Sequence, residues 1–175
     1  MSEPIDAIRL DALLREIGSR ARVPARVYLS GDASAVLGGW RDSAPAIALS
    51  FEPEEEPLLR ALPDMAGRFG AIVDIASPAD HFPELPGWRR RSPFITTIGC
   101  LDFHHYDFHA QALLAIQRNH DPDIRDVVEM VHRNLIDPPQ LRTLFNRIAR
   151  KLHRHPSIDP PRFQARLEAI LETTG

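Results

Sequence analysis

The chain has 175 residues, a net charge of -3, 43% hydrophobic and 26% charged residues, an ordinary composition for a globular protein. This length fits one domain, or one domain with a helical extension, and excludes two large domains. No apolar run approaches the roughly 18 residues of a membrane-spanning helix, the N-terminus lacks the pattern of a secretory signal, and the single Cys100 fits a reducing compartment, so we expect a cytoplasmic protein with no membrane partner.

The first predicted element is an amphipathic helix over residues 4–18. Its apolar side chains recur at the spacing i, i+3, i+4 and i+7, at Leu10, Leu13, Leu14 and Ile17. We expect Gly18 to end this helix, which we interpret as a packing element.

Residues 27–51 predict a strand, a tight turn, a short helix and a second strand. Val27 to Leu29 favour the first strand, Gly31 interrupts it, and the pair Gly38-Gly39 ends a helix that begins near Ser34. Asp32 is a good N-cap residue for that helix. Residues 46–51 then alternate small and bulky side chains with the period of a strand. Three of them face the core: Ile47, Leu49 and Phe51. Three face the other side: Ala46, Ala48 and Ser50.

The next segment predicts a helix followed by a strand that carries one carboxylate. Glu54 to Glu56 suit the first turn of a helix because the positive end of the helix dipole favours acidic residues. Residues 71–76 read as a strand that contains Asp74. Aspartate is disfavoured on strands, so Asp74 is either a functional carboxylate or a water-facing residue of an edge strand.

Two short strands, at 94–98 and 101–105, precede a region that is helical from Tyr106 onward. Three predicted helices begin with Asp-Pro, at Asp121, Asp137 and Asp159, where aspartate is the N-cap and proline the first helical residue. Apolar stripes along two of these helices predict that the helices pack as a bundle on the sheet domain. One stripe comprises Ile124, Val127, Val128, Val131 and Leu135, and the other Leu141, Leu144, Phe145, Ile148 and Leu152.

The order of these elements resembles the catalytic start of the polymerase-beta-like nucleotidyltransferases. Together, three segments resemble a family of small bacterial nucleotidyltransferase-fold proteins, distant relatives of abortive-infection toxins: GDASAVLGGWRDS, IVDIASPADHFPELPGW and YDFHAQALLAI. The resemblance implies an α+β fold with a small mixed β-sheet and flanking helices in residues 1–105. It also implies a C-terminal helical bundle in residues 106–175, packed on that core.

The family's activity is Mg2+-dependent transfer of a nucleotide from an NTP to RNA, such as tRNA, or to protein, in some members as a toxin. The resemblance implies that Asp74 is one metal-binding carboxylate and that Ala46 and Ala48 stand where the family has its catalytic Asp-x-Asp. It also assigns nucleotide-binding positions to Gly31, Ser34, Arg41 and Gln111, the last where relatives often have lysine.

Alanine cannot ligate Mg2+, which requires oxygen ligands, so Asp74 alone predicts weak metal binding and a chain inactive in metal-dependent transfer. Two explanations remain open. In the first, two aspartates of an active toxic enzyme were changed deliberately to make it tolerable to its host, and restoring both restores transfer. In the second, the chain is a natural pseudoenzyme that binds RNA or a protein partner, such as a cognate antitoxin or toxin.

Charge is distributed unevenly along the chain. Residues 138–175 contain seven basic and three acidic residues, whereas the remainder contains 14 basic and 21 acidic ones. The basic tail therefore suits RNA, an acidic partner, or the chain's own acidic body.

The histidines near the start of the helical region offer one more interpretation. His105 and His109 stand at i and i+4, a spacing that permits a shared metal ion. The alternative is that they are packing or capping residues.

Overall fold

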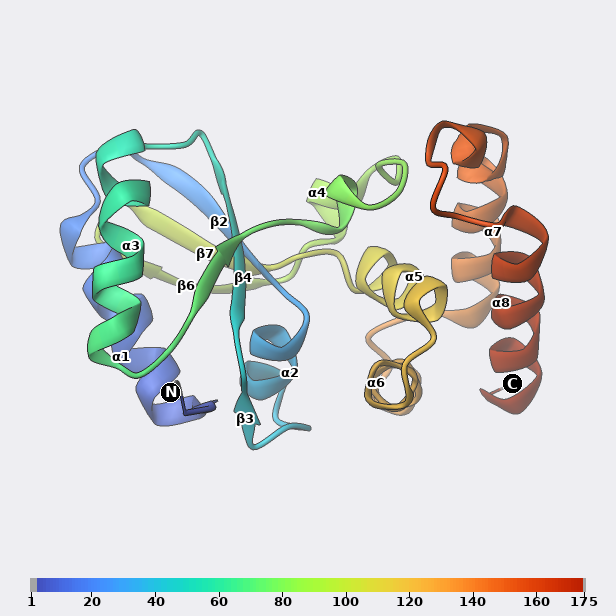
Figure 1. The fold of residues 1–175 in the computed structure, drawn as a ribbon, viewed down its shortest axis with the longest axis horizontal. Helices are drawn as coiled ribbons and strands as arrows, with labels where there is room; N and C mark the ends of the chain where they lie inside the picture. Colours follow the sequence, from blue (N-terminus) through green and yellow to red (C-terminus); the bar gives the residue numbers. More distant parts are fainter. Residues whose placement is uncertain (1–2, 175) are drawn as a thin grey trace. The chain divides into compact units, whose positions relative to one another are not determined.

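The structure is a computed structural model that describes residues 3–174, and the chain is an α+β protein (Figure 1). It divides into two compact units. The first comprises the residues up to Ser77 together with Ser92–Tyr106, and the second comprises Pro78–Arg91 together with the residues from Asp107 onward. Residues 78–91, predicted from the sequence as part of the first domain, belong to the second unit. Within residues 3–174, no helix combines the length and apolar character needed to cross a bilayer.

The first unit is built on a five-stranded mixed sheet in the order β5-β4-β2-β7-β6. β4 runs antiparallel to β2 and parallel to β5, while β7 runs parallel to β2 and antiparallel to β6. The strands are β2 (Ala25–Ser30), β4 (Ile47–Glu52), β5 (Val73–Ile75), β6 (Phe94–Ile98) and β7 (Leu101–His105). All five predicted strands are thus confirmed. A separate pair, β1 (Ile5–Asp6) and β3 (Ser43–Ala44), was not predicted.

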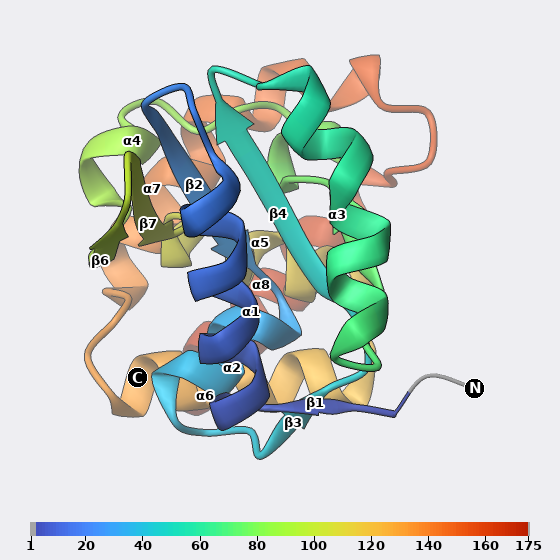
Figure 2. The ribbon, with the colours of Figure 1, turned by 90° about the vertical axis from the view of Figure 1, so that its left-hand side faces the viewer.

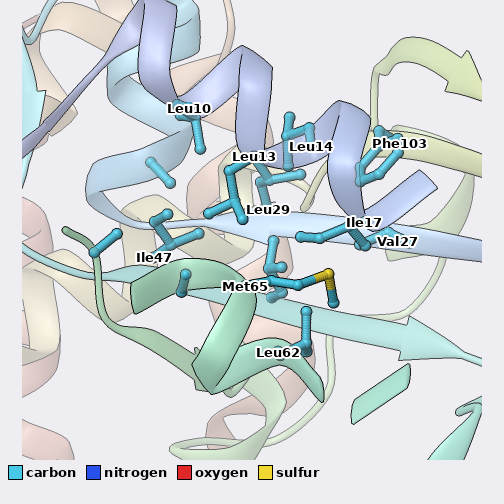
Figure 3. Close-up of a cluster of buried hydrophobic side chains, with 14 of the residues drawn as sticks. Leu10, Leu13, Leu14, Ile17, Val27, Leu29, Ile47, Leu62, Met65 and Phe103 are labelled. Atoms are coloured by element: carbon cyan, nitrogen blue, oxygen red, sulfur yellow. The ribbon is translucent and has the colours of Figure 1, made fainter. Parts of the chain in front are cut away.

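Helices α1 (Ala7–Arg20) and α3 (Glu56–Arg68) lie side by side on one face of this sheet (Figure 2). Their apolar stripes and the alternate residues of the strands form one buried cluster (Figure 3). It includes Leu10, Leu13, Leu14 and Ile17 of α1, Leu62 and Met65 of α3, and Val27, Leu29, Ile47, Leu49 and Phe103 of the sheet. The predicted inward face of residues 46–51 is therefore confirmed.

Gly18 does not end α1, contrary to the prediction, because the helix continues to Arg20. A Cβ atom at residue 18 would lie 2.5 Å from Cγ2 and 2.8 Å from the carbonyl oxygen of Ile98. Glycine is thus required inside the helix by a close approach to the end of β6. Glu55 also has a structural role that the sequence did not reveal. Its carboxylate accepts hydrogen bonds from the backbone N–H groups of Arg22 and Val23.

The second unit is helical, and α5 packs against α6, α7 and α8. Its elements are η1 (Pro78–Asp80), α4 (Trp88–Arg91), α5 (Phe108–Arg118), α6 (Asp121–His132), α7 (Pro138–Ile148), η2 (Ala149–Arg154) and α8 (Pro160–Thr174). The predicted caps are confirmed at Asp137 and Asp159, which accept from the N–H groups of Gln140 and Arg162. At α6 the prediction was wrong, because His120 is the N-cap and Asp121 is already helical.

The close approach at Gly18 generates a stability prediction. We expect Gly18→Ala to lower the free energy of unfolding by about 1–3 kcal/mol, because the methyl group overlaps backbone and side-chain atoms of Ile98. The matched control is Gly67→Ala in α3, where a Cβ meets no atom within 4 Å. There we expect a gain of up to about 1 kcal/mol from helix propensity. Urea denaturation followed by circular dichroism measures the stability of both variants. Equal changes in the two variants would contradict the close contact of residue 18 with Ile98.

Candidate functional site

One row of side chains crosses three neighbouring strands of the sheet. Ser30 of β2 pairs with Ala48 of β4, and Ala48 pairs with Asp74 of β5. Paired residues of neighbouring strands project to the same face, so these three side chains share the face opposite to α1 and α3. Ala48 is half-buried, and Asp74 is exposed to solvent. The register therefore brings Ala48 and Asp74 together, and adds Ser30, which was not predicted from the sequence.

Ala46 lies in the bend immediately before β4, because the strand begins at Ile47 and not at residue 46 as predicted. The ladder with β5 starts with the backbone N–H of Ile47, which donates to the carbonyl of Ile72 at 2.9 Å. Ala46 is thus next to the row along the chain, but strand alternation does not fix the direction of its side chain.

The predicted turn at Gly31 leads directly from β2 into α2 (Asp32–Gly38). Gly31 has φ 66° and ψ -138°, a conformation that only glycine adopts at low cost. Gly31 is the N-cap residue of α2, and Asp32, predicted as the N-cap, is instead the first helical residue. The predicted end of the helix at Gly38-Gly39 is confirmed, since Gly39 is a left-handed C-cap.

The carboxylate of Asp32 forms an ion pair with Arg41, with 2.5 Å between Oδ1 and Nη1. Both side chains are half-buried. The position suits a carboxylate, because the positive end of the helix dipole stabilises negative charge in the first turn. Arg41, a predicted nucleotide-binding residue, is therefore held by a carboxylate of the same chain at the start of α2.

Ser34, another predicted nucleotide-binding residue, is completely buried and bonded to a histidine. Its Oγ lies 2.7 Å from Nδ1 of His105, at the end of β7. Burial lowers the pKa of His105 to about 4, so the ring is neutral at pH 7. A serine beside a neutral histidine has the composition of a nucleophile and its base, but Ser34 has no exposed surface to present to a substrate.

The residues around Asp74 do not fit a bound Mg2+ ion. Magnesium demands several oxygen ligands in near-octahedral geometry, and the row supplies one carboxylate, one hydroxyl and one methyl group. Across residues 3–174 there is no group of three or more His, Cys, Asp and Glu side chains suited to a metal ion.

In the second unit, polar interactions gather around Asp107, which is completely buried and is the N-cap of α5. Its Oδ2 accepts from Nη2 and Nε of Arg91 at 2.7 and 3.1 Å, and its Oδ1 accepts from the N–H of His109. Burial acts to raise the pKa of Asp107, but hydrogen bonds from His109 and Arg91 and their charge outweigh it, so the pKa is lowered. This contact ties residues 78–91 to the second unit.

His105 and His109 do not share a helix, and each is bonded within the chain, as expected of packing or capping residues. His105 ends β7 and bonds to Ser34, whereas His109 lies in α5. Nδ1 of His109 is 3.4 Å from Oδ1 of Asp107, and Nε2 of His109 accepts from the backbone N–H of Asp137. Gln111, the last predicted nucleotide-binding residue, is also in α5 and is 5% exposed.

Comparison of the chain with models of protein families gave no match, and no similar protein was found among curated proteins or among solved structures.

The contact of the half-buried His105 with the buried Ser34 generates a pH prediction. Between about pH 6.5 and 4 the unfolded chain binds a proton at His105 and the folded chain does not. The free energy of unfolding should therefore fall as the pH drops through this window, by about 2–3 kcal/mol in total. The free energy of unfolding is measured against pH for the wild type and for His105→Gln, which should lose this pH dependence. The control is His132→Gln, which replaces an exposed histidine. An NMR titration midpoint for His105 at 6.5 or above would contradict this lowering of its pKa by burial.

Proposed function

We propose that the first unit is a nucleotidyltransferase-like core that has lost its catalytic metal site and acts by binding rather than by nucleotide transfer. The order of elements supports this proposal: β2, the turn at Gly31, α2, then β4 beside β5. The resemblance implies the same order, with a glycine turn before a helix, a strand for the Asp-x-Asp and a neighbouring strand for the third carboxylate.

The observation that carries the proposal is the pairing of Ala48 with Asp74. In active relatives two Mg2+ ions would neutralise the triphosphate and activate the acceptor hydroxyl, and bridging carboxylates would hold them. Here the carboxylate of Asp74 faces a methyl group across the ladder. Metal-dependent transfer is therefore not expected of this chain.

The contacts at the start of α2 favour a binding protein over an enzyme awaiting its metal. A triphosphate at this turn would have to displace Asp32 from Arg41 and would meet its negative charge. It would also find the hydroxyl of Ser34 buried against His105. Nucleotide contacts that the resemblance assigns to Arg41 and Ser34 are thus replaced by contacts within the chain.

A silenced enzyme is the second candidate, and the intact register of β4 with β5 favours it. If two aspartates were restored at positions 46 and 48, one of them would stand directly opposite Asp74. In either case, we interpret α5, α6, α7 and α8 as the C-terminal bundle of the family, and RNA or a cognate toxin or antitoxin as the partner.

The decisive variant combines Ala46→Asp with Ala48→Asp. We expect it to bind Mn2+, a spectroscopic substitute for Mg2+, with a dissociation constant below about 1 mM, because it adds one carboxylate opposite Asp74 and a second two residues earlier in the chain. Each single variant should bind at least tenfold more weakly. Electron paramagnetic resonance of free Mn2+ measures this. The matched control is Ala46→Asp with Ser50→Asp. It adds equal charge, but its second carboxylate stands at position 50 of β4, which pairs with Tyr28 of β2.

The same variants separate the two candidate functions. We would incubate them with Mg2+, labelled nucleoside triphosphates and total tRNA, with and without an added Asp32→Asn substitution that releases Arg41. A binding protein gains metal but transfers no label to RNA or to itself. Label transfer by the double variant would contradict the proposal in favour of a silenced enzyme, and no gain of Mn2+ binding would contradict the resemblance of this site to a nucleotidyltransferase.

A further inference from the structure

A cationic pocket lies in the second unit, between α4 with the turn before it and α7. It has a volume of about 420 Å³. Its lining comprises Pro86, Gly87, Arg90, Arg91, Gln140 and Arg147. No carboxylate is among these residues, so the side chains that reach the pocket are cations or hydrogen-bonding groups. An anion is the ligand that such a lining favours.

Two of the three arginines are uncompensated. Arg90 and Arg147 are exposed, and within residues 3–174 neither forms an ion pair with a carboxylate. Arg91 is different, because the buried carboxylate of Asp107 balances its charge. The pocket therefore carries the charge of two guanidinium groups that remain available to a ligand.

Arg91 forms a rigid wall of the pocket. Nε and Nη2 bond to Asp107, and Nη1 donates to the carbonyl of Pro86 at 2.8 Å. Gly87 permits this arrangement, since it has φ 76° and a Cβ there would lie 3.1 Å from Nη1 of Arg91. This wall of the pocket is thus fixed before any ligand arrives.

Positive charge continues along the chain beyond the pocket. After Arg147, the segment η2 carries Arg150, Lys151 and Arg154, all of them exposed. These cations exceed what a single phosphate group needs. A repeating polyanion fits this run of cations better than a mononucleotide does. Its repeating group is best a phosphate, because a guanidinium group binds two phosphate oxygens at once in a bidentate fork.

We propose that this pocket binds the phosphodiester backbone of a nucleic acid, with Arg90 and Arg147 contacting phosphate oxygens and Gln140 supplying a neutral hydrogen-bonding group. The proposal does not rest on the function proposed for the first unit, because all of its residues belong to the second. Backbone contacts carry no base information, so binding should tolerate any sequence.

The test uses the full chain and fluorescent 12-nucleotide single strands of RNA and DNA of equal sequence, measured by anisotropy from 50 to 300 mM KCl. We expect Arg90→Ala with Arg147→Ala to weaken binding at least tenfold at 50 mM. Loss of two phosphate contacts should also reduce the slope of log K against log[KCl] by about 1.4. Arg90→Lys with Arg147→Lys keeps the charge and should retain most of that slope. Comparison of the two strands shows whether RNA or DNA is preferred.

The matched control is Arg125→Ala with Arg162→Ala, which removes equal charge from exposed positions outside the pocket. Equal loss in both double variants would overturn the proposal, since it would show attraction by net charge alone. Tighter binding of an acidic peptide or a mononucleotide would overturn it as well. If the alanine variant fails to fold, NMR shifts of the Arg90 and Arg147 Nε–Hε groups in the wild-type chain decide, because an oligonucleotide that leaves both unmoved contradicts the proposal.

Discussion

β4 is paired on both edges, antiparallel to β2 and parallel to β5, and this double pairing decides which way each of its side chains points. A slip of one residue would carry Ile47 and Leu49, both completely buried, out of the core. Burial of each such side chain is worth about 1.5–3 kcal/mol, so the core side of the sheet enforces the register. The position of Ala48 opposite Asp74 on the other face is a consequence of that packing.

The two candidate sites are the turn into α2 beside Asp74 and the cationic pocket of the second unit. They differ in whether their polar groups are paired within the chain. A buried polar group is costly unless it is hydrogen-bonded, and the chain meets this requirement at Ser34 with His105 and at Asp107 with Arg91. These contacts organise the turn into α2 and the start of α5, and they withdraw the groups from ligands. Arg90 and Arg147 differ because solvent surrounds them. The residues best able to meet an anion therefore lie in the helical unit, and the resemblance to nucleotidyltransferases does not point to them.

Local patterns were enough to predict much of the fold from the sequence. The alternation of residues 46–51 and the turn at Gly31 gave β2, α2 and β4, and the apolar stripe of α7 is buried as expected. Features that depend on partners distant in the chain had no local signal. Gly18 remains helical because of Ile98, and Ser34 faces a histidine 71 residues away. Residues 78–91 join the second unit through the contact of Arg91 with Asp107, which no periodicity reveals.

The central claim is that the methyl group of Ala48 lies beside the side chain of Asp74, on the face of the sheet opposite to α1 and α3. Nuclear Overhauser effects from a 13C-labelled alanine methyl at position 48 test this most directly. The account predicts cross-peaks to the β protons of Asp74 and to Ser30, and none to Met65, which is buried on the other face. Cross-peaks from the Ala48 methyl to Met65, with none to Asp74, would contradict the register and with it the proposed origin of the missing metal site.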